Sequence, residues 1–335
     1  MTHPLRTLIV GFGSIADTLG DDKNMRRFFG SLSHAEALAK HQMFDLGAVL
    51  DPAPEARLRA VRRWGIERVF ESVEAAVKNY DPEIVIITSP PGERLNILNR
   101  FKGVKGVFLE KPLGGEAQAI LNWSIEAKVP VQVNYWRRAV PDFIEFSGSK
   151  LTSELGEIQA IFGTYGNGLR NNGSHLIDFA RMLIGEVESA HAIGFGEAVP
   201  LSKVKDDVNV GFCLLFSGNR AMVVLPVNFI HFREVSIDFW GTKSRLSISQ
   251  ESLLIQQFPL SENRGLDNEL EINSEQAQFI TPNVRQSLDA MYENLYQCIA
   301  CECPLLSSLE SAVQTEKVVS AIEDSISLNN QKISL

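Results

Sequence analysis

The chain has 335 residues, of which 44% are hydrophobic and 22% are charged, and its formal net charge is −9. Such a composition is typical of a globular protein, and the length suffices for two domains, each with its own core. Because the charge is acidic and no basic block interrupts it, nucleic acid and anionic membranes are not expected as partners.

The N-terminus begins Met1-Thr2-His3-Pro4 and then enters an apolar run, which predicts neither a signal peptide nor a membrane span. We therefore expect a cytoplasmic protein whose four cysteines are reduced thiols. Three of them, Cys298, Cys301 and Cys303, are closely spaced but have no fourth ligand nearby. Packing in a helix or at its end is favoured over a metal site, and no metal is expected.

The apolar run Leu8-Ile9-Val10 is followed by Gly11-Phe12-Gly13-Ser14-Ile15-Ala16, a G-x-G-x-x-A fingerprint for dinucleotide binding. Its glycines let the backbone turn tightly and approach a phosphate, and the N-terminus of a following helix offers N–H groups to that anion. We expect a strand, a glycine turn and the start of a helix. The residues predicted to contact the cofactor are Gly11, Phe12, Gly13, Ser14 and Ile15.

Residues 44–50 form the expected second strand, and Asp51 stands at its C-terminal end. A carboxylate in this position accepts both hydroxyls of a ribose and repels a 2′-phosphate, so NAD is favoured over NADP. Arg57 and Arg59 lie close enough in sequence to keep NADP as the less favoured cofactor.

Asp51 follows Gly13 by 38 residues, although about twenty is usual in such a unit, so the sequence predicts an insertion. We expect a short first helix, a loop over 21–27 and a second helix ending near residue 41. Ser33 and Glu36 have the spacing of a capping box at the start of that second helix, whose His34 and His41 are expected to face solvent. The loop is either a lid over the cofactor or, as favoured, a surface excursion.

Alternation of apolar strands and helices continues to residue 135, with further strands expected at 68–70, 84–87, 106–109 and 129–135. The strands lack polar alternation, as parallel strands covered on both faces do. The pattern predicts an α/β fold with a doubly wound parallel Rossmann sheet over 1–135. Polar turns end two strands, and Ser89 and Pro90 in one of them are predicted to contact the cofactor.

Residues 136–335 are predicted to form an α+β domain with a large open, mainly antiparallel sheet, because sequential strands are joined by short turns. Two helices, near 283–301 and 308–327, are expected to close the chain as packing elements. The strands are expected near 158–165, 189–195, 208–216, 221–227, 234–240, 245–249 and 253–258.

Behind the glycine fingerprint, Glu110-Lys111-Pro112 at the end of a strand resembles the glucose–fructose oxidoreductase / inositol dehydrogenase / MocA family. The segment 133–138 looks like that family's crossing into its second domain, and 173–178 matches its G-x-H-x-x-D helix. The resemblance covers nearly the whole chain. It implies an NAD-dependent oxidoreductase that assembles as a homodimer or homotetramer through the C-terminal sheet, with Glu110 and Asn134 near the cofactor.

The residues of these motifs suit proton transfer. Lys111, held between a carboxylate and a proline, is expected to bind a substrate hydroxyl, favour its alkoxide and bridge to the nicotinamide ribose; the alternative is a surface salt bridge with Glu110. His175 follows a glycine at a helix start and can exchange a proton near neutral pH; the alternative is a core histidine. Asp178 is expected to orient or support rather than react.

Two positions depart from the family pattern. Asn171 stands where many members carry an aspartate four residues before this histidine, which shifts any general-base role toward His175 with Lys111. The asparagine at this position also resembles the branch of the family that acts on nucleotide-linked or amino sugars. Arg94 stands where relatives often have histidine, and either contacts a cofactor or substrate phosphate or faces solvent.

The loop before His175 supplies the substrate-binding candidates Tyr165, Arg170, Asn171 and Asn172, with a place on the sheet face as the alternative for Tyr165. The expected reaction is hydride transfer between nicotinamide and a secondary alcohol or ketone of a sugar or sugar derivative, in a crevice between the domains. A cofactor-binding regulator, as in the galactose-pathway repressor that resembles this family, and a non-redox member with tightly bound NAD are the alternatives.

Overall fold

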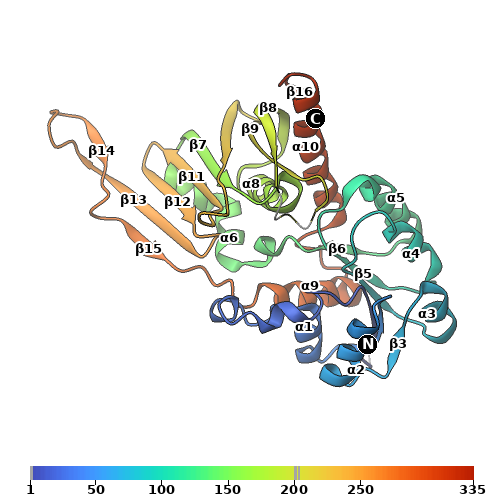
Figure 1. The fold of residues 1–335 in the computed structure, drawn as a ribbon. Helices are drawn as coiled ribbons and strands as arrows, with labels where there is room; N and C mark the ends of the chain where they lie inside the picture. The colour runs from blue at the N-terminus through green and yellow to red at the C-terminus, as the bar shows by residue number, and fades with distance from the viewer. Residues whose placement is uncertain (1–2, 200–201, 203) are drawn as a thin grey trace. The chain divides into compact units, whose positions relative to one another are not determined.

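The structure is a computed structural model that describes residues 3–199, 202 and 204–335 (Figure 1). Its chain divides into two compact units, Met1–Ala139 with Val284–Val313 and Val140–Asn283 with Gln314–Leu335. The first division falls close to the predicted boundary between 135 and 136. The segment 284–313, predicted in the second domain, belongs instead to the first unit. No helix among the described residues combines the length and apolarity needed to cross a bilayer.

The first unit contains six parallel strands in the order β3-β2-β1-β4-β5-β6, which confirms the predicted doubly wound sheet. Every residue of its central strands β4 and β5 is buried, because helices cover both faces of the sheet. The strands are β1 (Leu5–Val10), β2 (Phe44–Leu50), β3 (Arg68–Phe70), β4 (Ile84–Ile87), β5 (Gly106–Leu109) and β6 (Val131–Val133). The helices are α1 (His34–Lys40), α2 (Pro54–Trp64), α3 (Val73–Asn79), α4 (Arg94–Arg100), α5 (Ala117–Ala127) and α9 (Ser287–Cys301).

Helix α9 explains why 284–313 joins the first unit. Its residues Met291, Tyr292 and Leu295 are completely buried in the apolar cluster that also holds Ile9 and Phe108 of the parallel sheet. The sequence predicted the helical spacing of these apolar residues, but it did not predict which sheet they cover.

The segment after the fingerprint differs from the prediction. Residues 13–17 form turns, with the Asp17 N–H donating to the Gly13 carbonyl (3.0 Å), and the next element is a single 3₁₀ turn, Thr18–Asp21. The predicted short first helix is therefore wrong. The regular helix of this unit is α1, which begins only at residue 34.

Helix α1 begins with the predicted cap, because Ser33 Oγ accepts the Glu36 N–H (3.3 Å). The Glu36 carboxylate accepts the Leu32 N–H (2.9 Å) and pairs with Arg26 of the preceding loop. His41, expected to face solvent, lies largely buried and bonds to Glu293 of α9 (3.1 Å). Helix α1 is thus anchored to the first unit, whereas the predicted loop 21–27 is mostly exposed, as the favoured surface excursion requires.

The second unit contains a ten-stranded sheet in which the pair β7 and β10 is parallel and the other pairs are antiparallel, as predicted. Its strands are β7 (Ile158–Tyr165), β8 (Val187–Ala198), β9 (Val208–Phe216), β10 (Arg220–Pro226), β11 (Ser236–Gly241), β12 (Ser244–Ser249), β13 (Leu254–Glu262), β14 (Leu270–Ile272), β15 (Gln278–Ile280) and β16 (Ile333–Ser334). Its helices are α6 (Pro141–Glu145), α7 (Leu151–Leu155) and α8 (Ser174–Ile184), together with all but the first turn of α10 (Leu309–Ser327).

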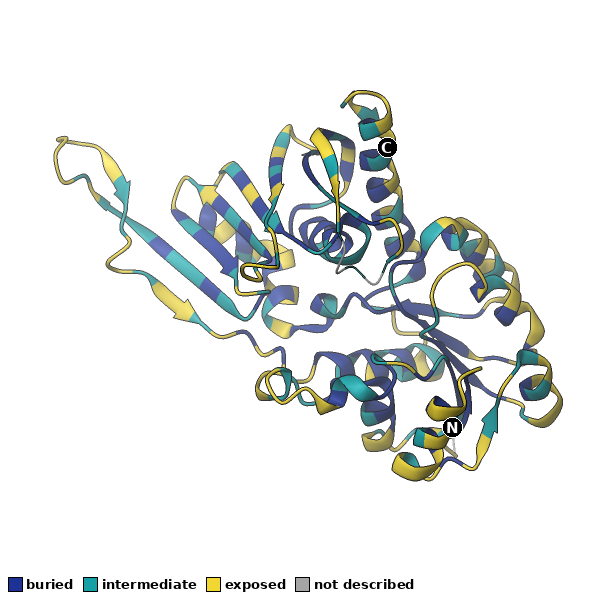
Figure 2. Ribbon diagram, viewed as in Figure 1, coloured by how far each residue is buried: buried dark blue, intermediate teal, exposed yellow. Residues whose placement is uncertain are grey.

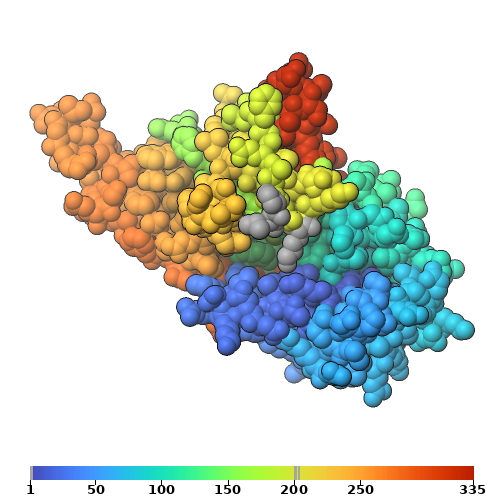
Figure 3. Space-filling view, viewed as in Figure 1, coloured from blue at the N-terminus to red at the C-terminus, as the bar shows by residue number. Residues whose placement is uncertain are grey.

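The sequence did not predict strands β14, β15 and β16. The first two belong to an arm that extends β13 away from the rest of its sheet, drawn in orange in Figure 1 and Figure 3. Figure 2 shows that much of this arm is exposed, whereas the strands at the centre of the sheet carry regularly spaced buried residues.

Tyr165 occupies the last position of β7 and is completely buried. Its hydroxyl donates to the Val210 carbonyl (2.8 Å) and accepts the Val210 N–H (3.0 Å), and its ring packs on Phe212. Burial raises the pKa of Tyr165. This placement contradicts the predicted substrate-binding role, because the side chain joins two regions of the sheet within the core.

Replacing the tyrosine tests this core role. Tyr165→Phe should lower the free energy of unfolding by about 1–3 kcal/mol, because the buried Val210 N–H and carbonyl lose their partner. Urea denaturation measures the change. Tyr80→Phe serves as the control, because the Tyr80 hydroxyl lies 3.4 Å from its acceptor and is only partly buried, so the cost should be much smaller. Equal midpoints for Tyr165→Phe and wild type would contradict the assignment.

Candidate active site

The glycine turn after β1 leaves room for a ligand. Gly11 has φ +84°, and a Cβ there would lie 3.0 Å from the Ser89 nitrogen and 3.1 Å from Thr88 Oγ1, so a side chain does not fit. A Cβ on Gly13 would meet no atom within 4 Å. The chain is therefore packed tightly on one side of the turn and open at Gly13.

Asp51 lies beside this turn, as the sequence predicted. It is mostly buried, and its Oδ2 accepts the Phe12 N–H (2.6 Å) while Oδ1 accepts the Ala53 N–H (2.8 Å). A carboxylate has about four lone-pair sites, so both oxygens can still accept hydroxyl donors. The carboxylate thus both shapes the glycine turn and faces the place where a ribose is expected.

The two arginines that kept NADP open brace the chain around Asp51. The Arg57 guanidinium donates to the Asp51 carbonyl (2.7 Å). Arg59 donates to the Asp17 carboxylate (3.0 Å) and to the Phe12 carbonyl (2.9 Å). Both arginine side chains therefore have structural hydrogen-bond partners within the first unit.

Asp17 is a residue that the sequence analysis missed. It is completely buried, and its carboxylate accepts the Trp64 indole N–H (2.9 Å) and pairs with Arg59 and Arg63. Because a buried charge is costly unless it is paired, these contacts fasten the turn after the fingerprint to helix α2.

Glu110, at the C-terminal end of β5, is the centre of a buried polar network. Its Oε1 accepts Asn134 Nδ2 (2.6 Å) and lies 2.9 Å from His34 Nε2, while His34 Nδ1 lies 2.6 Å from the Tyr292 hydroxyl. The expectation that His34 faces solvent is wrong, since its side chain is completely buried. The network joins α1, β5, α9 and the residue after β6.

The electrostatics of this network favour the ionised carboxyl. Burial opposes ionisation of Glu110, but the hydrogen bonds from His34 and Asn134 and the neighbouring charge of Lys111 outweigh it, so the pKa of Glu110 is lowered. Burial and then the charge of Glu110 raise the pKa of Tyr292. Lys111 is therefore next in the chain to a fixed negative charge.

Arg94 holds the backbone on both sides of Lys111. Its guanidinium is buried and donates to the carbonyls of Glu110 (2.5 Å) and Pro112 (2.9 Å) and, from its other nitrogens, to the Ser89 carbonyl. This burial contradicts the solvent-facing alternative, while contact with a cofactor or with a substrate phosphate stays a prediction. Arg94 fixes the turn that presents Lys111, which is half-buried.

Two buried polar atoms lie among the predicted cofactor residues. Ser89 Oγ and Asn134 Oδ1 have no hydrogen-bond partner within the described part of the chain. Orphaned buried polar atoms are rare in folded proteins and are met by water or a ligand. Together with the open space at Gly13 and the lone pairs of Asp51, they fit a dinucleotide along the C-terminal ends of these strands. Pro90, beside Ser89, is exposed.

In the second unit the loop before His175 is built around a buried carboxylate. Asp207 Oδ1 accepts the Arg170 N–H (2.9 Å) and Oδ2 accepts the Asn171 N–H (3.1 Å). Gly168 has φ +99°, and a Cβ there would lie 1.9 Å from Asp207 Oδ2. The sequence analysis missed Asp207, because the pair Asp206-Asp207 before a strand carries no motif.

The predicted substrate residues of this loop have different surroundings. Arg170 pairs with Glu323 of α10 (2.5 Å), so its side chain has a structural partner. The Asn171 amide donates to the Asn167 carbonyl (3.2 Å). Asn171, Asn172 and His175 are each half-buried, and His175 lies in the first turn of α8.

Asp178, one turn further along α8, is almost completely buried. Its carboxylate accepts the Thr315 hydroxyl (3.1 Å) and lies 3.7 Å from Arg181, and Arg181 also donates to Thr315 (2.7 Å). These contacts fasten α8 to α10 and agree with the expected supporting role.

The cysteine group lies at the end of α9. Cys298 is half-buried, and Cys301 and Cys303 are exposed thiols. Within 3–199, 202 and 204–335, no three histidine, cysteine, aspartate or glutamate side chains group closely enough to hold a metal ion.

Comparison with known proteins supports this interpretation of the first unit. Residues 5–135 match the family described as "Oxidoreductase family, NAD-binding Rossmann fold". The rhizopine catabolism protein MocA of Rhizobium meliloti is 23% identical over 217 residues, which are 58% of this chain and 68% of that protein.

Two solved structures share the fold over almost the whole chain. The WlbA dehydrogenase of Chromobacterium violaceum, in complex with NADH and UDP-GlcNAcA, has a TM-score of 0.74 and 19% identity, covering 100% of this chain and 97% of that one. A super-repressor mutant of Gal80p from Saccharomyces cerevisiae has a TM-score of 0.74 and 13% identity, covering 99% and 98%. A dehydrogenase and a repressor match equally well, so the fold alone does not decide the function.

The lowered pKa of Glu110 predicts how stability depends on pH. A group whose pKa falls on folding stabilises the protein above its unfolded pKa, about 4.3 for glutamate, and this contribution is lost as the pH falls through the folded value. Glu110→Gln cannot titrate. The difference in free energy of unfolding between wild type and Glu110→Gln should therefore be greatest near neutral pH and narrow below about pH 4.

Chemical denaturation across this pH range measures the difference. Glu126→Gln, on the exposed side of α5, is the control, and because its side chain is exposed its free energy of unfolding should differ only slightly from that of wild type. A wild-type advantage over Glu110→Gln that does not change with pH would mean that Glu110 is not held as a carboxylate.

Proposed function

We propose that this chain, whose residues 5–135 match the NAD-binding Rossmann fold of an oxidoreductase family and which is similar to MocA, is a member of the glucose–fructose oxidoreductase / inositol dehydrogenase / MocA family. The proposed reaction is hydride transfer between NAD and a secondary alcohol or ketone of a sugar or sugar derivative. The observation that carries the proposal is the placement of Lys111. Its backbone is clamped by Arg94, and the preceding side chain, Glu110, is a buried carboxylate. A cation fixed in this way suits the binding of a substrate oxygen.

The proposed cofactor contacts come from the C-terminal ends of the parallel strands. The turn 11–15 would receive the pyrophosphate, Asp51 the ribose hydroxyls, and the orphaned polar atoms of Ser89 and Asn134 the polar groups of the nicotinamide half. When bound, the nicotinamide supplies the hydride acceptor or donor of the reaction. NAD is the proposed form, because Asp51 repels a 2′-phosphate and Arg57 and Arg59 have structural partners.

The proton chemistry is assigned to Lys111 and His175, the side chains that the sequence motifs predict for it. Lys111 would hold the substrate oxygen and stabilise negative charge on it during oxidation, and His175 would take the hydroxyl proton. Asn171 would hold a neighbouring hydroxyl, since an amide donates and accepts but does not take a proton. Glu110, Asn134 and His34 position Lys111 and do not themselves meet the substrate in this proposal.

A regulator that binds the cofactor without turnover is the second candidate, favoured by the asparagine at position 171 and by the equal fold similarity to a repressor. The presence of both Lys111 and His175 supports the enzyme instead. The third candidate is a member of the family without net redox turnover, which keeps NAD tightly bound and regenerates it in each cycle. Sugars that change the absorbance of bound cofactor at about 340 nm would separate turnover from binding.

Assembly and location are proposed as expected from the sequence. One face of the second sheet exposes Phe162, Ile193 and Leu225, and apolar residues gathered on a sheet face favour association, here with a second copy.

All four cysteines lie in the described part of the chain and are free thiols, which supports a reducing compartment such as the cytoplasm.

Substitution of Lys111 tests the catalytic assignment. Lys111→Ala should lower kcat by at least about 10²-fold, because the cation at the substrate oxygen is lost, while the Kd for NAD stays nearly unchanged. Initial rates and isothermal titration measure the two quantities. Lys105→Ala removes a lysine that pairs with Glu83 at the other end of β5 and should leave both unchanged. Undiminished turnover in Lys111→Ala would rule out the role.

Cofactor selectivity tests the role of Asp51. We expect NAD to bind at least about tenfold more tightly than NADP, because the carboxylate repels the 2′-phosphate. Asp51→Asn keeps an oxygen to accept the Phe12 N–H but removes the charge, so the ratio of the two affinities should fall. Titrations of both cofactors into both proteins measure it. A preference for NADP in the wild type would overturn the proposed cofactor.

A further inference from the structure

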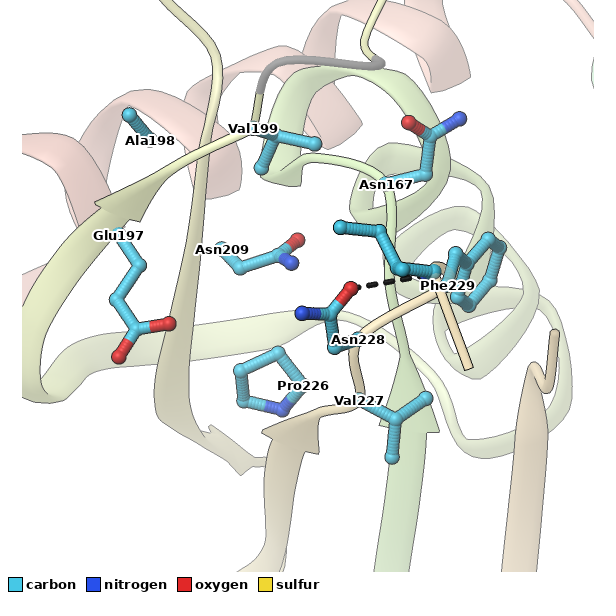
Figure 4. A pocket seen from close by; sticks show the side chains of 10 residues that line it. Asn167, Glu197, Ala198, Val199, Asn209, Pro226, Val227, Asn228 and Phe229 are labelled. Atoms are coloured by element: carbon cyan, nitrogen blue, oxygen red, sulfur yellow. Dashed lines mark hydrogen bonds between the residues drawn. The ribbon is translucent and has the colours of Figure 1, made fainter. Parts of the chain in front are cut away.

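Three cysteines lie at the end of helix α9, and the proposed reaction does not use them. Cys298 and Cys301 lie in the last turn of the helix, and Cys303 follows it. The fourth cysteine, Cys213, lies in the second unit on β9, the strand that also supplies Asn209 to the pocket drawn in Figure 4. Burial raises the pKa of the Cys213 thiol, which makes it a weak nucleophile near neutral pH.

The chain turns back where α9 ends. Glu302 has φ +57° and ψ 27°, in the left-handed region, and its N–H donates to the Cys298 carbonyl (3.1 Å). A residue in this conformation commonly ends a helix, and a proline shortly after it, here Pro304, cannot continue the helix. Cys303, between these two residues, therefore lies outside the helix.

A side chain of α9 holds the returning segment. Asn294 Nδ2 donates to the Pro304 carbonyl (3.0 Å), and Asn294 Oδ1 accepts the Leu306 N–H (2.8 Å). Asn294 and Cys298 are four residues apart, so they lie on the same face of the helix. Because Pro304 is fixed at Asn294, Cys303 is placed against this face, close to Cys298.

The electrostatics agree with this arrangement. Burial raises the pKa of the Cys298 thiol, and the charges of Cys303 and then of Glu310 raise it further. A charge shifts the pKa of a second group in this way when the two groups are close. Cys298 is half-buried and Cys303 is exposed, so an oxidant in solution meets Cys303 first.

Cys301 is a poorer partner for Cys298. These two residues are three apart within the helix, where such Cβ atoms are about 5–6 Å from each other. A disulfide requires Cβ atoms at about 3.5–4.5 Å. Cys303 lies in the turn after the helix, where a small change of the backbone can bring its sulfur to that of Cys298.

We propose that Cys298 and Cys303 form a reversible disulfide when hydrogen peroxide oxidises the protein. The Cys303 sulfur attacks one peroxide oxygen, the O–O bond breaks, and a sulfenic acid and water form. The Cys298 sulfur then attacks the Cys303 sulfur, the S–O bond breaks, and a second water leaves with the remaining thiol proton. Both thiols together lose two electrons, which reduce the peroxide to water.

The disulfide protects the end of a helix on which the first unit depends. A sulfenic acid that meets no thiol is oxidised further to sulfinic acid, which thiol reductants do not reverse. Helix α9 supplies the Tyr292 hydroxyl to His34 in the Glu110 network. The proposal does not rest on the proposed function, because the same thiols serve an oxidoreductase and a regulator alike.

Counting thiols tests the proposal. The reduced, full-length protein is treated with hydrogen peroxide in dilute solution, then unfolded and alkylated, and its mass is measured. We expect two of the four thiols to escape alkylation in the monomer and to be recovered after dithiothreitol. A protein that keeps all its thiols, that loses them only in covalent dimers, or that does not recover them with dithiothreitol overturns the proposal.

Serine variants identify the pair. Cys301→Ser and the control Cys213→Ser should still form the disulfide, whereas Cys303→Ser, a change at an exposed position, should form none. In Cys298→Ser the sulfenic acid of Cys303 should persist and react with dimedone. A disulfide that survives in Cys303→Ser, or that is lost in Cys301→Ser, overturns the pairing.

Asn294→Ala tests whether the returning segment sets the reaction. With dimedone present to compete for the sulfenic acid, the ratio of disulfide to dimedone adduct should fall about tenfold in this variant, because the two sulfurs are no longer held together. Gln297→Ala is the matched control, since that side chain bonds to Glu293 on the same helix (2.6 Å), and its ratio should equal that of wild type. An unchanged ratio in Asn294→Ala contradicts the proposed geometry.

Discussion

Burial of the Glu110 carboxylate is the constraint around which the first unit is arranged. A charge withdrawn from water is tolerated only when donors meet it, and these come here from separate elements. Asn134 follows β6, and His34 lies in α1 with the Tyr292 hydroxyl of α9 behind it. The buried carboxylate is therefore satisfied only when β6, α1 of the insertion and α9 from near the end of the chain all pack around it.

Lys111 gains its fixed position from the same arrangement. The side chain before it is held by the network, and the backbone on both sides is held by Arg94, itself buried. The ammonium group of a lysine lies at the end of a flexible side chain, so it can be positioned for catalysis only if the backbone that carries it is fixed. The second unit uses the same device, because Asp207 is a buried carboxylate that accepts the N–H groups of Arg170 and Asn171 and so shapes the loop before His175.

The parts of the fold that local patterns encode could be predicted from the sequence. The parallel strands have continuous apolar runs, the second sheet has alternating ones, and Gly11, Asp51 and Lys111 stand where strands end. What could not be predicted depends on distant partners. His34 and Glu110 are 76 residues apart, and nothing near a histidine in an amphipathic helix shows that it will be buried against a carboxylate. Tyr165 likewise stands beside the candidate loop in sequence but bonds to Val210 in the core.

The central claim is that the chain moves a hydride between a sugar carbon and bound NAD. The most direct measurement incubates the purified protein and NAD with sugars and cyclitols deuterated at their C–H positions, and then determines the mass of the cofactor after release from the protein. The account predicts that one of them transfers its deuterium, so that the recovered cofactor gains the label even when it never leaves the protein during turnover. A sugar that binds to the NAD-loaded protein, with no label reaching the cofactor from any member of the set, would contradict the account and favour a regulator.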